Sequence, residues 1–513
     1  MPASPSTARA INDRLALRLL QQEGPLTAGQ LKQLTGLSRP TVADLVDRLT
    51  ASGLITVVGE SGEQRRGPNA RLYGIVADRA HLAALDVRTE GVFVLVSDLV
   101  GRVLAEASVP IDPEAGTGPA VEQAVAAVES AAKEAGAMGA PPREDVRAWG
   151  RLHTVGIGAP GLIDPATGDL RDSAGLPAWH RSLAATLQDR LPGARVTVEN
   201  ETNLAALAEQ REGAARDRDT FVLLWLGHGV GAAVVLDGTL RRGASGGTGE
   251  IGFLPVPGTA TLPSATDCAG GFHSLTGAAA VASLAAECGL PTPATPDGPG
   301  VAEAVRAAVA EVLETAGEAV SVGEPIAAGA VTVAGPGAVV PAARPGGAGA
   351  EAGADSGPGT VSALVEAGPA VRVSGVDPGR DSASTSATAA RQGHVGCGAP
   401  QQPESGGAPP VVPPGELPAA RFLRILADRV AVGAASVVAV LDPGCVVLGG
   451  EVGQAGGAVL AGLVEERLRR MSPLVTEVRA SSLGGTAVLR GALLTARERA
   501  QDELFAPPER PGG

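Results

Sequence analysis

The sequence predicts an α/β protein that begins with a small winged helix-turn-helix. Three short helical stretches and two strand-like stretches fill the first 78 residues, and strand-like stretches alternate with helical ones from His81 onward. Such alternation is typical of an α/β body. Residues 321–414 break the pattern, because Gly, Ala, Pro and Ser dominate them without a helical or strand period. A segment of this composition buries too little apolar surface to offset chain entropy, so we expect a disordered insertion there.

The first two helices are predicted from apolar spacing. Within residues 8–23, fourfold spacing predicts an amphipathic helix with an inward face of Ile11, Leu15 and Leu19. A Gly-Pro pair ends this helix. The stretch LTAGQLKQL predicts a second, shorter helix with Leu31 and Leu34 facing inward.

The third helix carries the clearest signals of the N-terminal region. Ser38 is a good N-cap, and Pro40 lies in the first turn, where its missing N–H costs nothing. One apolar stripe faces the other helices and is formed by Val42, Leu45, Val46 and Leu49. After Gly53, two strand-like stretches joined by a polar loop predict a wing.

A helix-turn-helix places the N-terminal end of its recognition helix in the major groove of DNA. We therefore expect DNA contacts from the start of the third helix and from the wing, by Ser38, Arg39, Pro40, Thr41, Arg65 and Arg66. Arg39 is the strongest candidate for reading a base, since its guanidinium fork suits guanine. The alternative is a helical domain that docks a protein, because any three-helix domain shows similar apolar stripes.

Charge separates the N-terminal region from the rest of the chain. Residues 1–80 contain ten basic and seven acidic residues, a net charge of +3, whereas the whole chain carries −14. The remainder therefore carries −17, which argues against a protein that coats nucleic acid over its whole surface. A mildly basic head on an acidic body fits a single DNA-facing domain.

Cysteine usage and hydropathy point to the cytoplasm. The four cysteines are scattered and form no CxxC pair: Cys268, Cys288, Cys397 and Cys445. The N-terminus lacks the order of a signal peptide, and no apolar run reaches about eighteen residues. We expect a cytoplasmic protein with no membrane partner.

Several stretches of the body run from a strand into a glycine-rich turn or a helix start. They are VGIGAPGLIDPATG, VTVENETNLAALAE, LWLGHGVGAAVVLDGTLRRGASGGTGEIGF and LDPGCVVLGGEV. With TGLSRPTVADLVDRL in the head, their order and spacing resemble a transcriptional regulator of the ROK family (repressors, open reading frames, kinases). The resemblance implies a two-lobed actin/hexokinase-like ROK domain behind the winged helix-turn-helix, in a homodimer or homotetramer.

The resemblance also suggests how the chain divides. The expected parts are the DNA-binding winged helix-turn-helix, the first lobe, the second lobe in two pieces, and the insertion between those pieces. In that order, their boundaries are 1–78, 79–200, 201–320 with 415–513, and 321–414.

The first hairpin of the body departs from the pattern of the family's kinases. In those kinases a D-x-G-G-T turn brings bare amides close to the phosphates of ATP. Here the stretch LDVRTEGVFVLVSDLVGRVL keeps Asp86, but Arg88 and Thr89 take the glycine positions and Glu90 follows. Side chains block the approach that glycine permits, and a carboxylate repels phosphate. The glycine turns GHGVG and LGG are retained but suit ordinary hairpin and helix-start geometry, so we expect no bound ATP.

The catalytic turn departs as well. The family's kinases have an Asp after Asn at a strand-to-helix turn, whereas this chain has Glu199-Asn200-Glu201. The longer Glu displaces the carboxylate, and general-base geometry tolerates little error. Negative charge after an Asn N-cap is favourable whatever its chemistry. We therefore expect no catalytic residue, and the resemblance implies instead that Asn200, Glu201 and Glu250 line a ligand cleft.

The zinc site of the family is incomplete in this chain. Relatives carry a His after G-E-I-G and a Cys-rich loop, whereas Phe253 takes the place of that His here. The loop retains one Cys and one displaced His, Cys268 and His273. A closed tetrahedral site needs four ligands, so no metal is expected.

The sequence thus predicts a DNA-binding transcriptional regulator, a repressor of carbohydrate-related genes, and not an enzyme. Its partners would be a double-stranded DNA operator and a sugar or sugar derivative. Two alternatives stay open. One is an active ROK sugar kinase with an added helix-turn-helix, and the other is a regulator whose body senses no small molecule.

Overall fold

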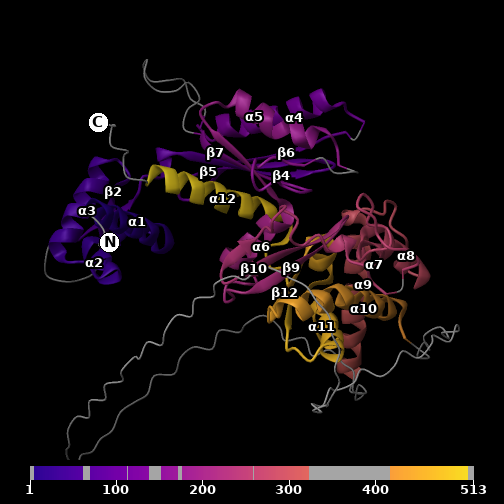
Figure 1. Cartoon of the computed structure of the whole chain (residues 1–513). Helices are drawn as coiled ribbons and strands as arrows, with labels where there is room; N and C mark the ends of the chain where they lie inside the picture. The colour runs from indigo at the N-terminus through magenta and orange to yellow at the C-terminus, as the bar shows by residue number, and fades with distance from the viewer. Residues whose placement is uncertain are drawn as a thin grey trace, which may run out of the picture. The chain divides into compact units, whose positions relative to one another are not determined.

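The computed structural model of the chain describes residues 5–61, 70–112, 114–137, 152–171, 176–257, 259–322 and 416–505. Figure 1 shows how the helices and strands of these residues are arranged. The predicted wing residues Arg65 and Arg66 lie outside the described residues, as does all but the first two residues of the insertion predicted at 321–414.

The N-terminal region is a three-helix unit with a small antiparallel sheet. Its helices are α1 (Pro5–Glu23), α2 (Ala28–Thr35) and α3 (Arg39–Ala51). Its strands β1 (Leu26–Thr27), β2 (Ile55–Ser61) and β3 (Ala70–Ile75) lie in the order β1-β3-β2. The stripe predicted on α3 is confirmed, since Val42, Leu45, Val46 and Leu49 are all buried.

Two predicted inward faces in this region are wrong in part, since Leu19 of the first and Leu31 of the second do pack against the core. Ile11 and Leu15 are 58% and 39% exposed, and α1 instead buries Ala16, Leu17 and Leu20. The helix offers two apolar stripes because leucines crowd its second half, and the stripe that packs against the core is shifted by one to two residues. Leu34 is also exposed, since it lies in the last turn of the eight-residue α2, whereas Leu31 is buried.

The body contains two five-stranded sheets. The first consists of β4 (His81–Arg88), β5 (Gly91–Asp98), β6 (Val103–Pro110), β7 (Leu152–Ala159) and β8 (Arg195–Asn200). Their order is β6-β5-β4-β7-β8, with β7 parallel to both β4 and β8. Helices α4 (Thr117–Glu134) and α5 (Trp179–Arg190) cover one face, and the C-terminal helix α12 (Ala487–Leu504) lies against the other (Figure 1).

The second sheet repeats this plan. Its strands are β9 (Phe221–Leu226), β10 (Val230–Leu236), β11 (Thr239–Arg241), β12 (Cys445–Gly449) and β13 (Glu477–Ala480), in the order β11-β10-β9-β12-β13. Helices α8 (Ala278–Glu287), α9 (Gly298–Val322), α10 (Pro418–Leu441) and α11 (Gly450–Met471) build a common core with it. In both sheets a three-strand meander is followed by two parallel strands, which confirms the predicted α/β architecture.

Shorter elements connect these layers. Helix α6 (Glu201–Glu212) follows β8 directly and packs against both α12 and β10. Helix α7 (His273–Thr276) and the 3-10 turns η1 (Ala77–Arg79), η2 (Ile251–Phe253) and η3 (Gly484–Thr486) complete the described chain. The turn from β8 into α6 therefore joins the two sheets, and it contains the predicted ligand residues Asn200 and Glu201.

Candidate functional site

The start of α3 is fixed by local hydrogen bonds. The Ser38 hydroxyl accepts a bond from the backbone N–H of Thr41 at 3.3 Å, which makes Ser38 the N-cap as predicted. In the preceding turn, Gly36 adopts a left-handed conformation with φ of 69°, which suits glycine, and its N–H donates to the carbonyl of Lys32. Helix α2 begins with a capping box between Thr27 and Gln30. These caps fix where α2 begins and ends and where α3 begins.

The predicted DNA-contacting residues of α3 lie on its solvent-facing end. Ser38, Arg39 and Pro40 are exposed and Thr41 is half-buried, while the next residue, Val42, points into the core. Arg39 forms no ion pair or side-chain hydrogen bond with any described residue. An unpaired guanidinium at the exposed N-terminal end of a helix is available to an anionic or base-edge partner.

Acidic residues on α3 are partly neutralised by Arg48. Its guanidinium forms ion pairs with Asp44 one turn before it and with Asp13 of α1, the latter at 2.5 Å. The hydrogen bond to Asp13 is the main reason that the pKa of Arg48 lies above its ordinary value. Because Asp44 is paired within the domain, it opposes a nearby phosphate less than a free carboxylate would.

The head is bonded to the end of α12. The Arg14 guanidinium lies 3.0 Å from the carboxylate of Asp502, and the Gln501 amide donates to the side-chain oxygen of Gln21 at 2.9 Å. Gln21 in turn donates to the carbonyl of Val100, next to β5, at 3.0 Å. Polar bonds thus connect α1 to both the C-terminal helix and the first sheet.

The first hairpin of the body is closed by its own side chains. Strands β4 and β5 pair up to Arg88 and Gly91, so only Thr89 and Glu90 form the turn. The Arg88 guanidinium folds back and donates to Asp86 through Nε at 3.0 Å and Nη2 at 2.7 Å. It also stacks 4.6 Å from the ring of Phe93. Asp86 is 2% exposed, and its burial raises its pKa although Arg88 acts in the opposite direction.

The second glycine turn is filled by a residue that the sequence analysis missed. Gly227, between β9 and β10, has no side chain of its own, but the carboxylate of Glu451 occupies the adjacent space so closely that a Cβ on Gly227 would collide with it. Glu451 is the second residue of α11, and its Oε2 is buried without a hydrogen-bond partner among the described residues. Loss of hydration raises its pKa. The only sequence signal was a carboxylate directly after Gly449-Gly450.

The predicted ligand residues lie at the β8–α6 turn and beside it. The Asn200 side chain caps α6 by accepting bonds from the N–H groups of Thr202 and Asn203, at 2.9 and 3.2 Å. Its amide donates to the carbonyl of Gly161 at 3.1 Å and to Glu201 at 2.9 Å. Asn200 is therefore largely occupied by structural bonds.

Glu201 belongs to a group of carboxylates. Loss of hydration, together with the negative charges of Asp86, Glu250 and Glu451, raises the pKa of Glu201 to about 8. Glu250 is exposed to solvent, yet partial loss of hydration raises its pKa as well. The structure thus brings Glu201 and Glu250 into electrostatic contact and adds Asp86 and Glu451 to the same group.

The residues at the positions of the predicted incomplete zinc site lie near this group: burial is the main cause that raises the pKa of Cys268, and the charges of Asp267 and Glu250 add to it. Phe253 ends η2 and is 38% exposed, and Cys268 precedes α7. Within the described ranges, no three His, Cys, Asp or Glu side chains come together as a metal site. No helix of those ranges is long and apolar enough to cross a membrane.

The chain is similar to two protein families and to a solved structure. Residues 143–289 and 412–499 match the ROK family, and residues 11–67 match the MarR family. A solved structure of a ROK family transcriptional regulator, described as a homolog of the E. coli MLC protein, superimposes with a TM-score of 0.60. It covers 97% of this chain and 98% of its own, and at 17% identity it shows the fold.

Two curated proteins show what the chain is similar to in sequence. It is 25% identical over 250 residues to the xylose repressor of Caldicellulosiruptor bescii, a match covering 48% of this chain and 59% of that protein. It is 39% identical over 102 residues to the glucokinase of Thermotoga maritima, covering 20% of this chain and 32% of that protein. The chain therefore spans less than two thirds of either relative.

Proposed function

We propose that this chain, which belongs to the ROK family and carries a MarR-family winged helix at its N-terminus, is a DNA-binding transcriptional regulator that represses carbohydrate-related genes. The observation that carries the proposal is the exposed start of α3, where Arg39 is unpaired among the described residues. The similarity to a xylose repressor supports the carbohydrate link.

In this proposal the N-terminal end of α3 enters the major groove of an operator. Arg39 donates a bidentate pair of hydrogen bonds to a guanine edge, and Ser38 and Thr41 contact phosphates from the first turn of the helix. Pro40, in the first turn of α3, makes van der Waals contact with the DNA in this proposal. Arg65 and Arg66, which lie outside the described residues, are proposed to contact the backbone or minor groove from the wing.

The body acts in this proposal as an effector-binding domain and not as an enzyme. Arg88 satisfies the carboxylate of Asp86, so Asp86 is not free to hold a metal ion beside a nucleotide phosphate. Glu451 places a second carboxylate against the other glycine turn, where it would repel phosphate. These two contacts support a protein that does not use ATP. We propose that it binds no zinc either, because Phe253 stands where the zinc-binding relatives carry a His, and that Asn200, Glu201 and Glu250 face a sugar or sugar derivative.

Regulation by such a ligand would be a shift between two arrangements of the body. Two-fold pairing of the winged helices on an operator requires at least a homodimer, and a homotetramer would satisfy the same requirement. A ligand that binds one arrangement better changes the spacing of the paired heads and thereby the affinity for DNA. We place this activity in the cytoplasm, where the operator lies.

The test of the proposal is a gel shift with the DNA upstream of the chain's own gene and of its neighbours. We expect a sequence-specific complex that survives excess unrelated DNA at moderate salt. If the chain shifts promoter and unrelated DNA equally, or shifts neither, the proposal is wrong. Adding candidate sugars to the complex then tests whether the body senses them.

One observation favours a second candidate function, a sugar kinase. A carboxyl with a pKa of about 8, as for Glu201, has the proton affinity of a general base that works near neutral pH. The matched stretch of the Thermotoga maritima glucokinase points the same way. A coupled ADP-release assay with a panel of hexoses separates the two functions, since turnover that is lost on Glu201→Ala would establish the kinase.

A further inference from the structure

A cavity of about 320 Å³ lies between α12 and the edge strand β8. Cavities of roughly 300 Å³ and above hold small-molecule ligands in proteins. Its polar lining residues come from four separate segments of the chain: Asp164, Thr197, Glu199, Arg242, Thr495 and Arg499. None of the three predicted cleft residues lines it.

The cavity has a fixed wall. Gly246 has a φ of 79°, and its loop lies so close to the carbonyl of Ile163 that a Cβ on Gly246 would collide with this oxygen. Gly156 similarly leaves room for the backbone of α12 at Ala492. The glycines let these segments approach closely, and the cavity opens beside them.

Both carboxylates that line the cavity are already paired. Glu199 accepts bonds through Oε1 from the Asn203 amide at 3.0 Å and through Oε2 from Nε of Arg242 at 2.6 Å. Asp164 is paired with Arg171 at 3.0 Å. Neither Glu199 nor Asp164 is therefore free to bind a cation in the cavity.

Its guanidinium groups, by contrast, keep unused hydrogen-bond donors. Arg499 forms no ion pair or hydrogen bond with any described residue, and Arg242 uses only Nε, leaving both of its Nη groups unengaged within the described chain. The acidic neighbours of Arg499 on α12 are turned to other partners, Glu498 to Arg211 and Glu503 to Arg195. Arg499 thus presents an unpaired guanidinium group to the cavity, and Arg242, although paired with Glu199, adds the donors of its two Nη groups. Such donors suit a carboxylate or phosphate group.

We propose that this cavity binds a small anionic metabolite of monosaccharide size, whose carboxylate or phosphate ester is held by Arg499 and Arg242. The chain as a whole has a net charge of −14, so the positive charge that favours an anion here comes from Arg499, and Arg242 adds hydrogen bonds. The hydroxyl of Thr495 and the polar edge of β8 face the remainder of the ligand.

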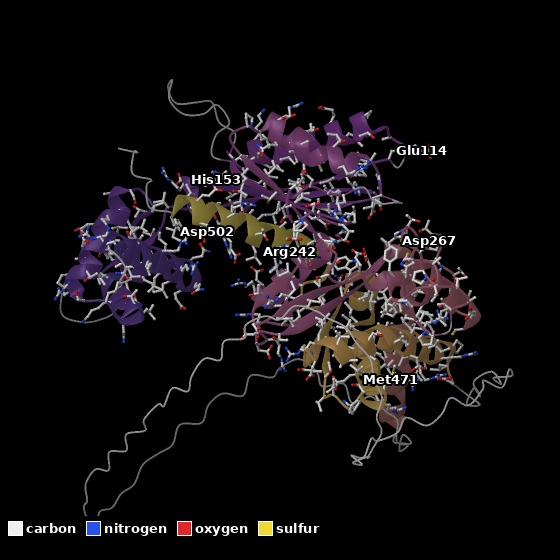
Figure 2. All side chains as sticks on the ribbon, in the orientation of Figure 1. Glu114, His153, Arg242, Asp267, Met471 and Asp502 are labelled. Carbon is white, nitrogen blue, oxygen red and sulfur yellow. The ribbon has the colours of Figure 1, made fainter. Side chains whose placement is uncertain are left out.

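The same helix connects this cavity to the head. Thr495 and Arg499 line the cavity, and two to three residues further Gln501 and Asp502 bond to Gln21 and Arg14 of α1 (Figure 2 labels Arg242 and Asp502). A ligand that fixes this part of α12 is therefore placed to bias the contacts of α1. This effect on the contacts of α1 rests on the proposed function, whereas the binding of the ligand to the cavity does not.

The proposal is tested by calorimetric titration of the full chain with glucose 6-phosphate, glucuronate, inorganic phosphate and glucose. We expect glucose 6-phosphate or glucuronate to bind at one site per chain with a dissociation constant below about 1 mM. Binding of the first alone identifies a phosphate ester, and binding of the second alone identifies a carboxylate. Arg499→Gln should lower the affinity for the anion at least tenfold, because the substitution removes the positive charge but keeps much of the side chain's shape.

The matched control is Arg490→Gln, on the same helix but paired with Glu212 outside the cavity, which should leave the affinity unchanged. The proposal is overturned if no anion binds, or if Arg499→Gln binds as the unaltered chain does. It is also overturned if Glu250→Ala, and not Arg499→Gln, removes binding, since the anion then lies in the cleft. None of these outcomes bears on the gel shift, which uses DNA alone.

Discussion

The start of α3 exposes Arg39 to solvent, whereas the β4–β5 turn of the body directs Arg88 inward onto a buried Asp86. Both places have the form in which proteins meet phosphate groups, a helix start in one case and a tight turn after a strand in the other. At the start of α3, Arg39 has no partner among the described residues. At the β4–β5 turn, Arg88 neutralises the carboxylate of Asp86. The difference explains why we assign contacts with DNA phosphates to the start of α3, and no contacts with nucleotide phosphates to the β4–β5 turn.

The two sheets of the body extend this comparison. They share one strand order, but their first hairpins are filled in different ways. The β4–β5 turn is filled by residues of the turn itself, and the β9–β10 turn by Glu451, which comes from α11 more than 200 residues later in the chain. A glycine turn that looks intact in sequence can thus be closed by a distant side chain.

The largest effect is expected from breaking the Asp86–Arg88 pair. Arg88→Ala leaves a carboxylate that is 2% exposed without its ion pair, so the free energy of unfolding at pH 7 should fall by about 2–4 kcal/mol. The loss should be smaller at pH 4 than at pH 7, because burial raises the pKa of Asp86 and the unpaired carboxylate takes up a proton more readily as the pH falls. Chemical denaturation at pH 7 and pH 4 measures the loss in the free energy of unfolding at each pH.

The matched control for Arg88→Ala is Arg102→Ala. Arg102 also pairs with a buried aspartate, Asp98, but that carboxylate keeps bonds from the N–H groups of Val100 and Arg102. The control should cost no more than about 1 kcal/mol. Equal losses in the two variants would show that Arg88 has no special role in closing the turn.

The next largest effect is expected at the exposed start of α3. Arg39→Ala should weaken operator binding by about 10- to 100-fold, the worth of one bidentate guanine contact, without changing the stability of the head. Fluorescence anisotropy with a labelled promoter fragment measures it. Arg306→Ala, an exposed arginine of α9 without a partner among the described residues, is the control and should bind DNA normally. An unchanged affinity for Arg39→Ala would move the DNA contact elsewhere.

A pH effect should follow from Glu201. Its pKa in the folded chain is about 8, above the ordinary value for a glutamate, so the stabilisation present at low pH is lost as the pH rises toward 8. Glu201→Gln keeps the oxygen that accepts from Asn200 and removes the charge. The variant should be more stable than the unaltered chain by about 1–3 kcal/mol at pH 8 and nearly equal at pH 4 to 5.

Thermal unfolding at these pH values measures the Glu201 effect. Glu106→Gln, an exposed position on β6, provides the comparison and should keep the pH dependence of the unaltered chain. A Glu201→Gln variant whose stability gain is the same at pH 5 and pH 8 would contradict the assignment.

The smallest effect is expected from the cap of α3. Ser38→Ala removes one N-cap hydrogen bond to Thr41 and should lower stability by about 1 kcal/mol, with faster amide hydrogen exchange confined to the first turn of α3. Operator affinity should fall only a few-fold, since Arg39 remains. Ser52→Ala, at the other end of the same helix, should leave exchange in that first turn unchanged.

Local features of the chain were predictable because short-range physics determines them. Ser38 and Asn200 cap the helices that the sequence assigned to them, and the alternation of strands and helices predicted the α/β architecture. The inward face of α1 was predicted only in part: Leu19 packs against the core, but several leucines allow two stripes and only tertiary packing selects Leu17 and Leu20.

The candidate site was less predictable than the fold. The place of Arg88 in the turn was visible in sequence, but its fold-back onto Asp86 depends on the two-residue hairpin. The contact of Glu451 with Gly227 and the shared cavity of Arg242 and Arg499 depend on segments that are far apart in the chain. Spacing within a motif carries no information on such contacts.

The most direct test of the central proposal is a calorimetric titration of the full chain with ATP and Mg²⁺ in the presence of glucose. If Arg88 and Glu451 close the two turns, no saturable binding should appear up to about 1 mM ATP. Saturable binding at one site per chain that is lost on Asp86→Ala would contradict the account, because the nucleotide would then occupy the turn that we regard as closed.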